Sequence, residues 1–252
     1  MVIDEFSLKG RIAAVTGANK GLGLSMALAL AEAGADIVAL TRKTAPELEE
    51  GVRSLGRRYE RIGADLSRPE TMEALAEKTL AAFGHIDILV NNAGVTPVHP
   101  AAEYPKEDLD RVFDVNVKSL YLLCQGIGRD MIKRRYGKII NICSIQSCLG
   151  GTNVSAYAAS KHAAAGITRA LANEWGQYGI NVNGIAPGFM TTDNTALLRS
   201  HPGVTEALAE KVPLKRWGSG EDLKGPVVFL ASESSRFVNG HLLIVDGGFI
   251  ND

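Results

Sequence analysis

The fold of this chain is decided by residues 11–34, which read Arg-Ile-Ala-Ala-Val-Thr-Gly-Ala-Asn-Lys-Gly-Leu-Gly-Leu-Ser-Met-Ala-Leu-Ala-Leu-Ala-Glu-Ala-Gly. Arg11–Thr16 is a short apolar run typical of a buried parallel strand, and the Ala/Leu-rich stretch Leu24–Ala33 is typical of a helix. The turn between them has the glycine spacing G-x-x-x-G-x-G, which departs from the G-x-G-x-x-G fingerprint. Such a turn presents backbone N–H groups and the positive end of a helix dipole, which favours pyrophosphate binding over a tight turn that binds nothing.

Apolar strand-like runs alternate with helical patterns along the rest of the chain. This alternation predicts an α/β fold, a single Rossmann-type doubly wound parallel sheet of about seven strands with helices on both faces, formed by residues 1–252 as one domain. The expected strands after the first are residues 37–42, 58–62, 86–90, 138–143, 180–185 and 241–245, and the expected helices lie near 20–33, 45–55, 69–83, 106–135, 155–177 and 220–231.

Composition excludes several classes of partner. The 27 basic and 28 acidic residues give a net charge of −1, so there is no electrostatic reason to propose nucleic acid or an anionic membrane. The three cysteines are an odd number without metal-ligand spacing and the five histidines are scattered, so we expect no metal site and a reduced, cytoplasmic protein. The N-terminus has no signal peptide pattern, and the uncharged stretch 139–160 is too polar to span lipid.

The end of the second expected strand bears on the choice of dinucleotide. An NAD-preferring site usually places an acid about 20 residues after the glycines, where it holds the ribose 2′-OH. This chain has Thr41 and Arg42 there, with Lys20 inside the glycine turn. Two cations would attract a 2′-phosphate, so NADP is predicted over NAD, and the alternative is that both are solvated surface charges.

Tyr157 and Lys161 stand four residues apart, and Ser144 precedes the tyrosine by thirteen residues. An i, i+4 pair shares one face of a helix, so the ammonium can lie beside the phenol and favour the phenolate. Tyr157 is therefore a candidate proton carrier. The spacing alone is weak evidence, because tyrosine and lysine fall four apart in many amphipathic helices.

Polar segments follow the third and fourth expected strands, at Gly63–Leu66 and Asn91–Gly94, where a doubly wound sheet binds ligands. With these segments, the whole chain resembles the short-chain dehydrogenases/reductases. The resemblance rests on the order and spacing of Gly17, Gly21-x-Gly23, Asp65, Asn91-Asn92-Ala93-Gly94, Asn116, Ser144, Tyr157-x-x-x-Lys161 and Pro187-Gly188.

The resemblance implies hydride transfer between a nicotinamide and a secondary alcohol or ketone. Tyr157 would exchange the proton, Ser144 would position the oxygen, Lys161 would tune the tyrosine and hold the nicotinamide ribose, and Asn116 would support a proton-relaying water. Cofactor contacts are expected from Gly17, Asn19, Lys20, Gly21, Leu22, Gly23, Thr41, Arg42, Asp65, Leu66, Asn91, Ala93, Gly94, Tyr157, Lys161, Pro187, Gly188, Met190 and Thr191.

The C-terminal half is similar to a group of sugar-acid dehydrogenases that includes 2-dehydro-3-deoxy-D-gluconate 5-dehydrogenases and 2-deoxy-D-gluconate 3-dehydrogenases, on segments such as Ala172–Trp175, Asp193–Thr195 and Arg216–Gly218. One departure is Val95–His99, where that group carries arginines, so His99, Arg199, Lys211 and Arg216 are left as candidates for a substrate carboxylate. A general NADP-dependent carbonyl reductase and a non-catalytic dinucleotide-binding sensor remain alternatives. Residues 190–212 are polar-rich and partly helical and are expected to form a substrate flap, with an ordinary surface excursion as the alternative. The resemblance also implies a homotetramer that pairs helices 106–135 and 155–177 and the C-terminal strand region.

Overall fold

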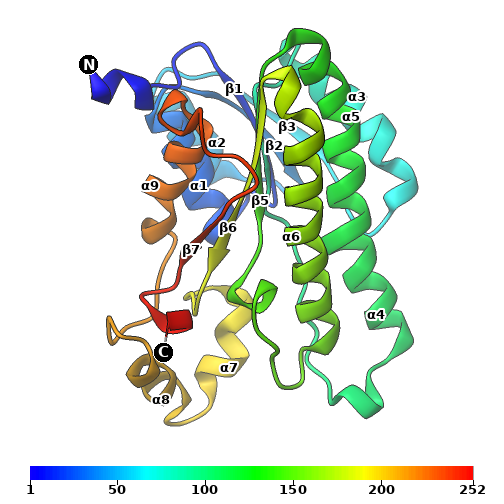
Figure 1. The fold of residues 1–252 in the computed structure, drawn as a ribbon, viewed down its shortest axis with the longest axis vertical. Helices are drawn as coiled ribbons and strands as arrows, with labels where there is room; N and C mark the ends of the chain where they lie inside the picture. Colours follow the sequence, from blue (N-terminus) through cyan, green and yellow to red (C-terminus); the bar gives the residue numbers. More distant parts are fainter. Residues whose placement is uncertain (252) are drawn as a thin grey trace.

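The computed structural model describes residues 1–251, apart from the side chains of Asn194 and Leu197. It contains one seven-stranded sheet in the order β3-β2-β1-β4-β5-β6-β7, and every neighbouring pair of strands is parallel (Figure 1). The strands are β1 Ile12–Thr16, β2 Asp36–Thr41, β3 Tyr59–Gly63, β4 Ile88–Asn91, β5 Gly137–Ile142, β6 Ile180–Pro187 and β7 Leu242–Val245. The predicted doubly wound parallel sheet is confirmed, with strand ends that differ from the predicted ones by at most two residues.

Helices cover both faces of the sheet. α1 (Gly21–Glu32), α2 (Pro46–Ser54) and α9 (Glu221–Ala231) pack together on one face, and α3 (Met72–Phe83), α5 (Ser119–Arg134) and α6 (Ser155–Trp175) pack together on the other (Figure 1). α4 (Lys106–Phe113) leads into α5. Among residues 1–251, no helix has both the length and the apolar character needed to cross a membrane.

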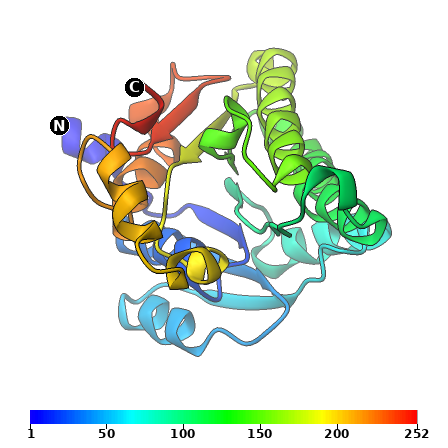
Figure 2. The same ribbon diagram turned by 90° about the horizontal axis from the view of Figure 1, so that it is seen from below.

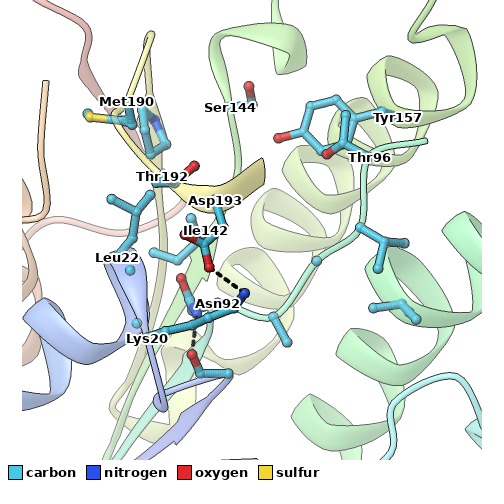
Figure 3. Close-up of a pocket in the computed structure, with 18 of the residues that line it drawn as sticks. Lys20, Leu22, Asn92, Thr96, Ile142, Ser144, Tyr157, Met190, Thr192 and Asp193 are labelled. Carbon is cyan, nitrogen blue, oxygen red and sulfur yellow. Dashed lines mark hydrogen bonds and ion pairs between the residues drawn. The ribbon is translucent and has the colours of Figure 1, made fainter. Parts of the chain in front are cut away.

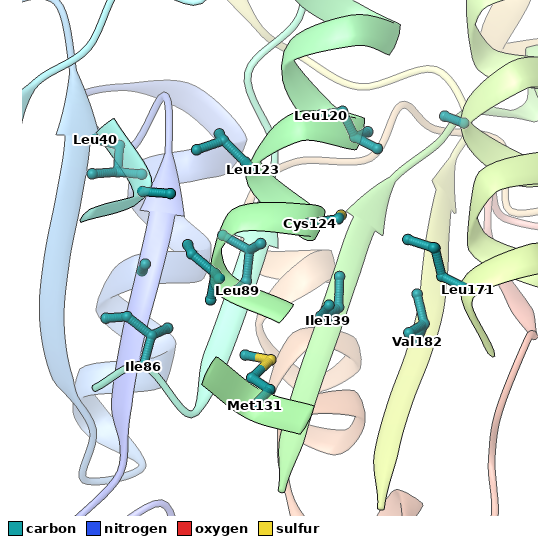
Figure 4. Packing of buried hydrophobic residues seen from close by; sticks show 14 of the residues in the cluster. Leu40, Ile86, Leu89, Leu120, Leu123, Cys124, Met131, Ile139, Leu171 and Val182 are labelled. Carbon is teal, nitrogen blue, oxygen red and sulfur yellow. The ribbon is translucent and has the colours of Figure 1, made fainter. Parts of the chain in front are cut away.

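Two apolar layers hold the helices against the sheet. Alternate residues of β1 divide between them, since Ala14 joins the layer under α5 and α6 while Val15 joins the layer under α1 and α9. Leu123 of α5 is fully buried in the first layer, which Figure 4 shows between the strands and the helices. Because both faces are covered, the strands are continuous apolar runs and lack the alternation of a half-exposed sheet.

The long helix predicted over residues 106–135 is interrupted. A π-helical turn over Asp114–Lys118 joins α4 to α5, so the predicted helical stretch is present but contains a turn that the sequence did not predict. A π-turn inserts one residue without changing the apolar character of the sequence, so periodicity gives no sign of it, and such turns are frequent at functional sites. The inserted turn contains Asn116.

Residues 190–212, which we call the 190–212 segment, leave the end of β6. The segment contains α7 (Ala196–Ser200) and α8 (Val204–Lys211). Figure 2 looks onto the edge at which the strands end and shows α7 and α8 in front of it. At its start, Thr191 N–H donates to the Gly218 carbonyl at 2.9 Å and Gly218 N–H donates to the Phe189 carbonyl at 2.8 Å.

Candidate active site

A cleft of about 570 Å³ lies at the carboxyl ends of the strands, where the strand order reverses between β1 and β4. This is the position at which open α/β sheets bind ligands. Of the predicted site residues, those that line the cleft are Gly17, Asn19, Lys20, Gly21, Leu22, Gly23, Thr41, Arg42, Asp65, Leu66, Ala93, Gly94, Ser144, Tyr157, Lys161, Pro187, Gly188 and Met190.

The glycine turn is shaped so that a ligand can approach its backbone. Gly17 and Gly21 have φ of +65° and +56°, which other residues rarely adopt. A Cβ on Gly23 would lie 2.3 Å from the Gly17 carbonyl oxygen, so only glycine fits where α1 begins. The turn therefore leaves its N–H groups and the start of α1 uncovered by side chains, which fits the pyrophosphate of a dinucleotide.

The turn is tied to the loop after β4 by a residue that the sequence analysis did not single out. The Asn92 side-chain amide donates to the Thr16 carbonyl at 2.9 Å and to the Gly17 carbonyl at 3.3 Å. The Thr16 hydroxyl in return accepts the N–H groups of Asn92 and Ala93, both at 2.9 Å. These bonds hold the two loops in a fixed relative position. The only sign of this role in the sequence was the position of Asn92 inside the Asn91–Gly94 segment.

The end of β2 separates its two predicted cofactor residues. Thr41 is buried, and its hydroxyl donates to the Lys43 carbonyl at 2.7 Å, so it shapes the turn. Arg42 is exposed and lines the cleft together with Lys43, which the sequence analysis missed. Asp65 lies near Arg42, and its pKa is below its usual value because the Ser67 hydroxyl and N–H donate to the carboxylate, with a smaller contribution from Arg42.

Two serines follow β5, and the structure gives them different roles. Ser144 lines the cleft, and its hydroxyl oxygen accepts the Gln146 N–H at 3.1 Å. Figure 3 shows the Tyr157 hydroxyl directed toward the side of the cleft where Ser144 lies. Ser147 is buried, and its hydroxyl donates to the Lys161 carbonyl at 2.8 Å. Of these two serines Ser144 is therefore the one that lines the cleft, whereas Ser147 bonds the backbone of α6.

Lys161 and Asn116 lie behind the tyrosine in a buried network. The Lys161 ammonium donates to the Ile142 carbonyl at 2.6 Å and lies 5.6 Å from the centre of the Tyr157 ring. The Asn116 amide donates to the Val95 carbonyl and to the Ser160 hydroxyl, and its oxygen accepts the Val95 N–H, all at 3.0 Å. The π-turn thus connects to the loop after β4 and to α6. Asn116 itself is not among the residues that line the cleft.

Two other predicted cofactor residues lie outside the cleft lining. Asn91 is buried behind its loop, where its amide donates to the Asn141 side-chain oxygen at 2.9 Å and to the Cys124 sulfur at 3.2 Å. Thr191 pairs through its N–H with Gly218. The neighbouring residues Asn92 and Thr192 line the cleft instead, which the sequence analysis did not predict.

The four residues predicted to bind a substrate carboxylate do not line the cleft. His99 Nε2 lies 2.8 Å from an Asp108 carboxylate oxygen, Arg199 donates to the Thr192 carbonyl at 3.1 Å, and Arg216 forms two hydrogen bonds to Asp222. None of these three, nor Lys211, is among the described residues that line the cleft. The cations that line it are Lys20, Arg42, Lys43, Arg111 and Lys161. Within residues 1–251, no group of three or more His, Cys, Asp or Glu side chains is placed to hold a metal ion.

Comparison with known proteins agrees with this geometry. A family model described as enoyl-(acyl carrier protein) reductase matches residues 17–250. The chain is 46% identical over 251 residues to a 2-dehydro-3-deoxy-D-gluconate 5-dehydrogenase of Dickeya dadantii, with 99% of each chain covered, and 46% identical over 249 residues to one of Bacillus subtilis, with 98% of each covered. A crystal structure of a gluconate 5-dehydrogenase from Burkholderia cenocepacia with NADP and tartrate has a TM-score of 0.95 at 37% identity and covers all of both chains.

The chain therefore belongs to the short-chain dehydrogenase/reductase family, as the motifs predicted. Within that family, its similarity to sugar-acid dehydrogenases extends over essentially the full length of both chains.

Proposed function

We propose that the protein is an NAD(P)-dependent oxidoreductase that transfers hydride between a nicotinamide and a secondary alcohol or ketone of a sugar acid, such as 2-dehydro-3-deoxy-gluconate or 2-deoxygluconate. The observation that carries the proposal is the meeting of Ser144, Tyr157 and Lys161 with the glycine turn in one cleft. The full-length relatives, which are sugar-acid dehydrogenases, support the substrate class.

The residues of the cleft fit a dinucleotide. A side chain on Gly23 would collide with the glycine turn, so the turn has no side chain there, and the cations Lys20, Arg42 and Lys43 line the same cleft. When bound, the nicotinamide supplies or accepts the hydride. In the reductive direction Tyr157 donates a proton to the developing alkoxide, and in oxidation it accepts one. Ser144 positions and polarises the same oxygen, while Lys161, whose ammonium lies 5.6 Å from the centre of the Tyr157 ring, would hold the nicotinamide ribose.

We further propose NADP as the preferred cofactor, with NAD as the alternative. The Arg42 side chain lines the cleft near the Asp65 carboxylate but forms no hydrogen bond or ion pair within the described part of the chain, so it is available for a 2′-phosphate. The NADP bound to the Burkholderia cenocepacia relative supports this choice.

The test is a panel of sugar acids, polyols and simple ketones, run with NADPH, NADP, NADH and NAD, in which absorbance of the reduced nicotinamide reports turnover. We expect the fastest turnover with a sugar acid and an NADP form. Turnover of simple ketones alone would establish a general carbonyl reductase. This alternative is favoured by one observation, that the four residues predicted to bind a substrate carboxylate are not among those that line the cleft. Cofactor binding without turnover of any substrate would indicate a sensor.

The remaining proposals concern organisation. We propose that residues 1–252 act as one NAD(P)-binding domain and that the 190–212 segment is the substrate flap, because Met190, Thr192 and Leu198 line the cleft. Hydrogen exchange with and without substrate would test the flap, since its amides should become protected on binding. We also propose that the protein works in the reduced cytoplasm, on the basis of three free cysteines. Cell fractionation tests that location.

A homotetramer is our proposal for the assembly, through helices 106–135 and 155–177 and the C-terminal strand region. It is supported by exposed apolar side chains on those surfaces, Tyr121 on α5 and Ile244 on β7. Sedimentation velocity tests the number of subunits.

A further inference from the structure

An ion pair crosses the cleft between two parts of the chain that are far apart in sequence. The Lys20 ammonium, in the glycine turn, lies 2.6 Å from a carboxylate oxygen of Asp193, in the 190–212 segment (Figure 3). Both residues line the cleft. The sequence analysis assigned Lys20 to the cofactor and gave Asp193 no role, so the pairing is a property of the fold alone.

The pair is exposed, with 63% of the Lys20 side chain and 74% of the Asp193 side chain accessible to solvent. The hydrogen bond from Lys20 holds the pKa of Asp193 below its usual value, so the carboxylate is charged at neutral pH. Exposed pairs between flexible side chains are weak, because water screens the charges and the side chains lose freedom. Another anion can therefore displace Asp193 from Lys20 with little loss of stability.

The two cations predicted for a 2′-phosphate are thus in different states. Arg42 forms no hydrogen bond or ion pair in the described part of the chain, whereas Lys20 already has a carboxylate partner. A phosphate that recruits Lys20 must first replace Asp193, while a cofactor without that phosphate leaves the pair intact. The cofactor specificity of the site is the difference between its affinities for NADP and for NAD. A carboxylate of the protein that competes with the 2′-phosphate lowers the affinity for NADP and leaves the affinity for NAD unchanged.

We propose that Asp193 is a cofactor-specificity determinant, whose carboxylate competes with the 2′-phosphate of NADP for Lys20 and so reduces the preference for NADP over NAD. This inference rests on the proposed function, because it requires a dinucleotide in the cleft. The structure assigns Asp193 no part in hydride or proton transfer.

The first experiment compares the wild-type protein with Asp193→Asn, titrated with NADPH and with NADH in the absence of substrate, with nicotinamide fluorescence as the measurement. We expect NADPH to bind about two- to fivefold more tightly to the variant, the size expected for an exposed ion pair, and NADH affinity to stay the same. Glu206→Gln is the matched control. Glu206 is exposed on α8 of the same segment, so this variant loses the same charge without touching Lys20, and both affinities should be unchanged.

The second experiment repeats the comparison in a Lys20→Gln background. If Asp193 acts through Lys20, Asp193→Asn will have no effect on NADPH affinity once the lysine is absent, which is the non-additivity expected of two groups in contact. A gain in NADPH affinity that persists without Lys20 would show a general charge effect and would overturn the proposal.

Two other outcomes also overturn the inference. An equal loss of affinity for NADPH and NADH in Asp193→Asn would show that the ion pair persists when a dinucleotide is bound and helps to hold it. Unchanged affinity for both would show that the carboxylate does not compete at all. The proposed function fails in a different way, because a wild-type protein that binds neither NADPH nor NADH would remove the basis of both proposals before any variant is made.

Discussion

The two ends of the cleft, the proposed catalytic end around Tyr157 and the proposed phosphate end around Lys20 and Arg42, are built differently. At the catalytic end, Asn116, Ser144 and Lys161 are buried, and the side chain of each has a backbone hydrogen-bond partner. At the phosphate end, Lys20 and Arg42 lie exposed on turns, and Lys20 is held only by an exposed carboxylate. Removal of a buried group leaves its partners unsatisfied, whereas a change in an exposed charge alters binding and little else. Reaction chemistry and cofactor choice should therefore respond to mutation independently.

The largest effect should come from Tyr157→Phe. The phenol is the proposed proton carrier, and loss of a general acid or base typically lowers a rate by about 10²- to 10⁴-fold. Steady-state kinetics with the best substrate of the panel would measure this loss in kcat. Cofactor affinity should change little, because the aromatic ring remains. A variant with wild-type kcat would show that the Tyr157 hydroxyl is not the proton carrier and that this end of the cleft is not the catalytic end.

The pair Ser144→Ala and Ser147→Ala sharpens the contrast inside the catalytic end. Ser144→Ala removes a hydroxyl that faces the cleft and should lower kcat/KM by about 10²-fold. Ser147→Ala removes a buried hydroxyl that bonds the Lys161 carbonyl, so it should lower the free energy of unfolding by about 1–2 kcal/mol. Kinetics and thermal unfolding of both variants test this division. The reverse pattern would mean that the two serines had been assigned the wrong way round.

Arg42→Asp should exchange the cofactor preference while leaving the chemistry intact. A carboxylate there would repel a 2′-phosphate and could accept a hydrogen bond from a ribose 2′-OH, so we expect the ratio of kcat/KM for NADPH to that for NADH to fall about tenfold or more. The measurement is kcat/KM with each cofactor, and kcat with the preferred one is the control. An unchanged ratio would count against Arg42 as a phosphate ligand and against the functional contrast between the two ends.

The smallest effect should come from Asp222→Asn, in the first turn of α9. Asp222 accepts two hydrogen bonds from Arg216 and one from the Ser219 N–H, which hold its pKa well below the usual value. Its loss should lower the free energy of unfolding by about 1 kcal/mol, or Tm by about 2–4 °C.

The pH dependence of this effect has a definite sign. A carboxyl whose pKa is lower in the folded than in the unfolded state adds stability above the unfolded value, and that stability is lost as the pH falls toward the folded value. The gap in Tm between the wild-type protein and Asp222→Asn should therefore be full at neutral pH and narrow below about pH 4. A gap of the same size at both pH values would show that the charge of Asp222 is irrelevant.

Much of the fold followed from local pattern. The alternation of apolar runs with helical stretches and the glycine turn after the first run predicted the doubly wound sheet, because burial on both faces requires such strands. The π-turn at Asn116 was missed, since one extra residue in a helix leaves the apolar pattern almost unchanged. Strand ends differed from the predicted ones by a residue or two for another reason, because hydrogen-bonding partners and not hydrophobicity decide where a strand stops.

The candidate site was predictable where backbone conformation limits the choice of residue. Gly17, Gly21 and Gly23 are such positions, since two need positive φ and the third has no room for a Cβ. Side chains whose role depends on distant partners were not predictable. Asn92 binds the glycine turn from the loop after β4, and His99 pairs with Asp108 and does not line the cleft.

The sequence by itself determined the parallel sheet, the glycine turn, and the presence of a tyrosine and a lysine one helical turn apart, because these depend on properties of neighbouring residues. Only the tertiary structure decided which serine faces the cleft, which cation is free and which is paired, and that Asp193 meets Lys20 across 173 residues of chain. Contacts of that kind depend on how elements pack, and an exposed charge shows no periodicity along a sequence from which its partner could be inferred.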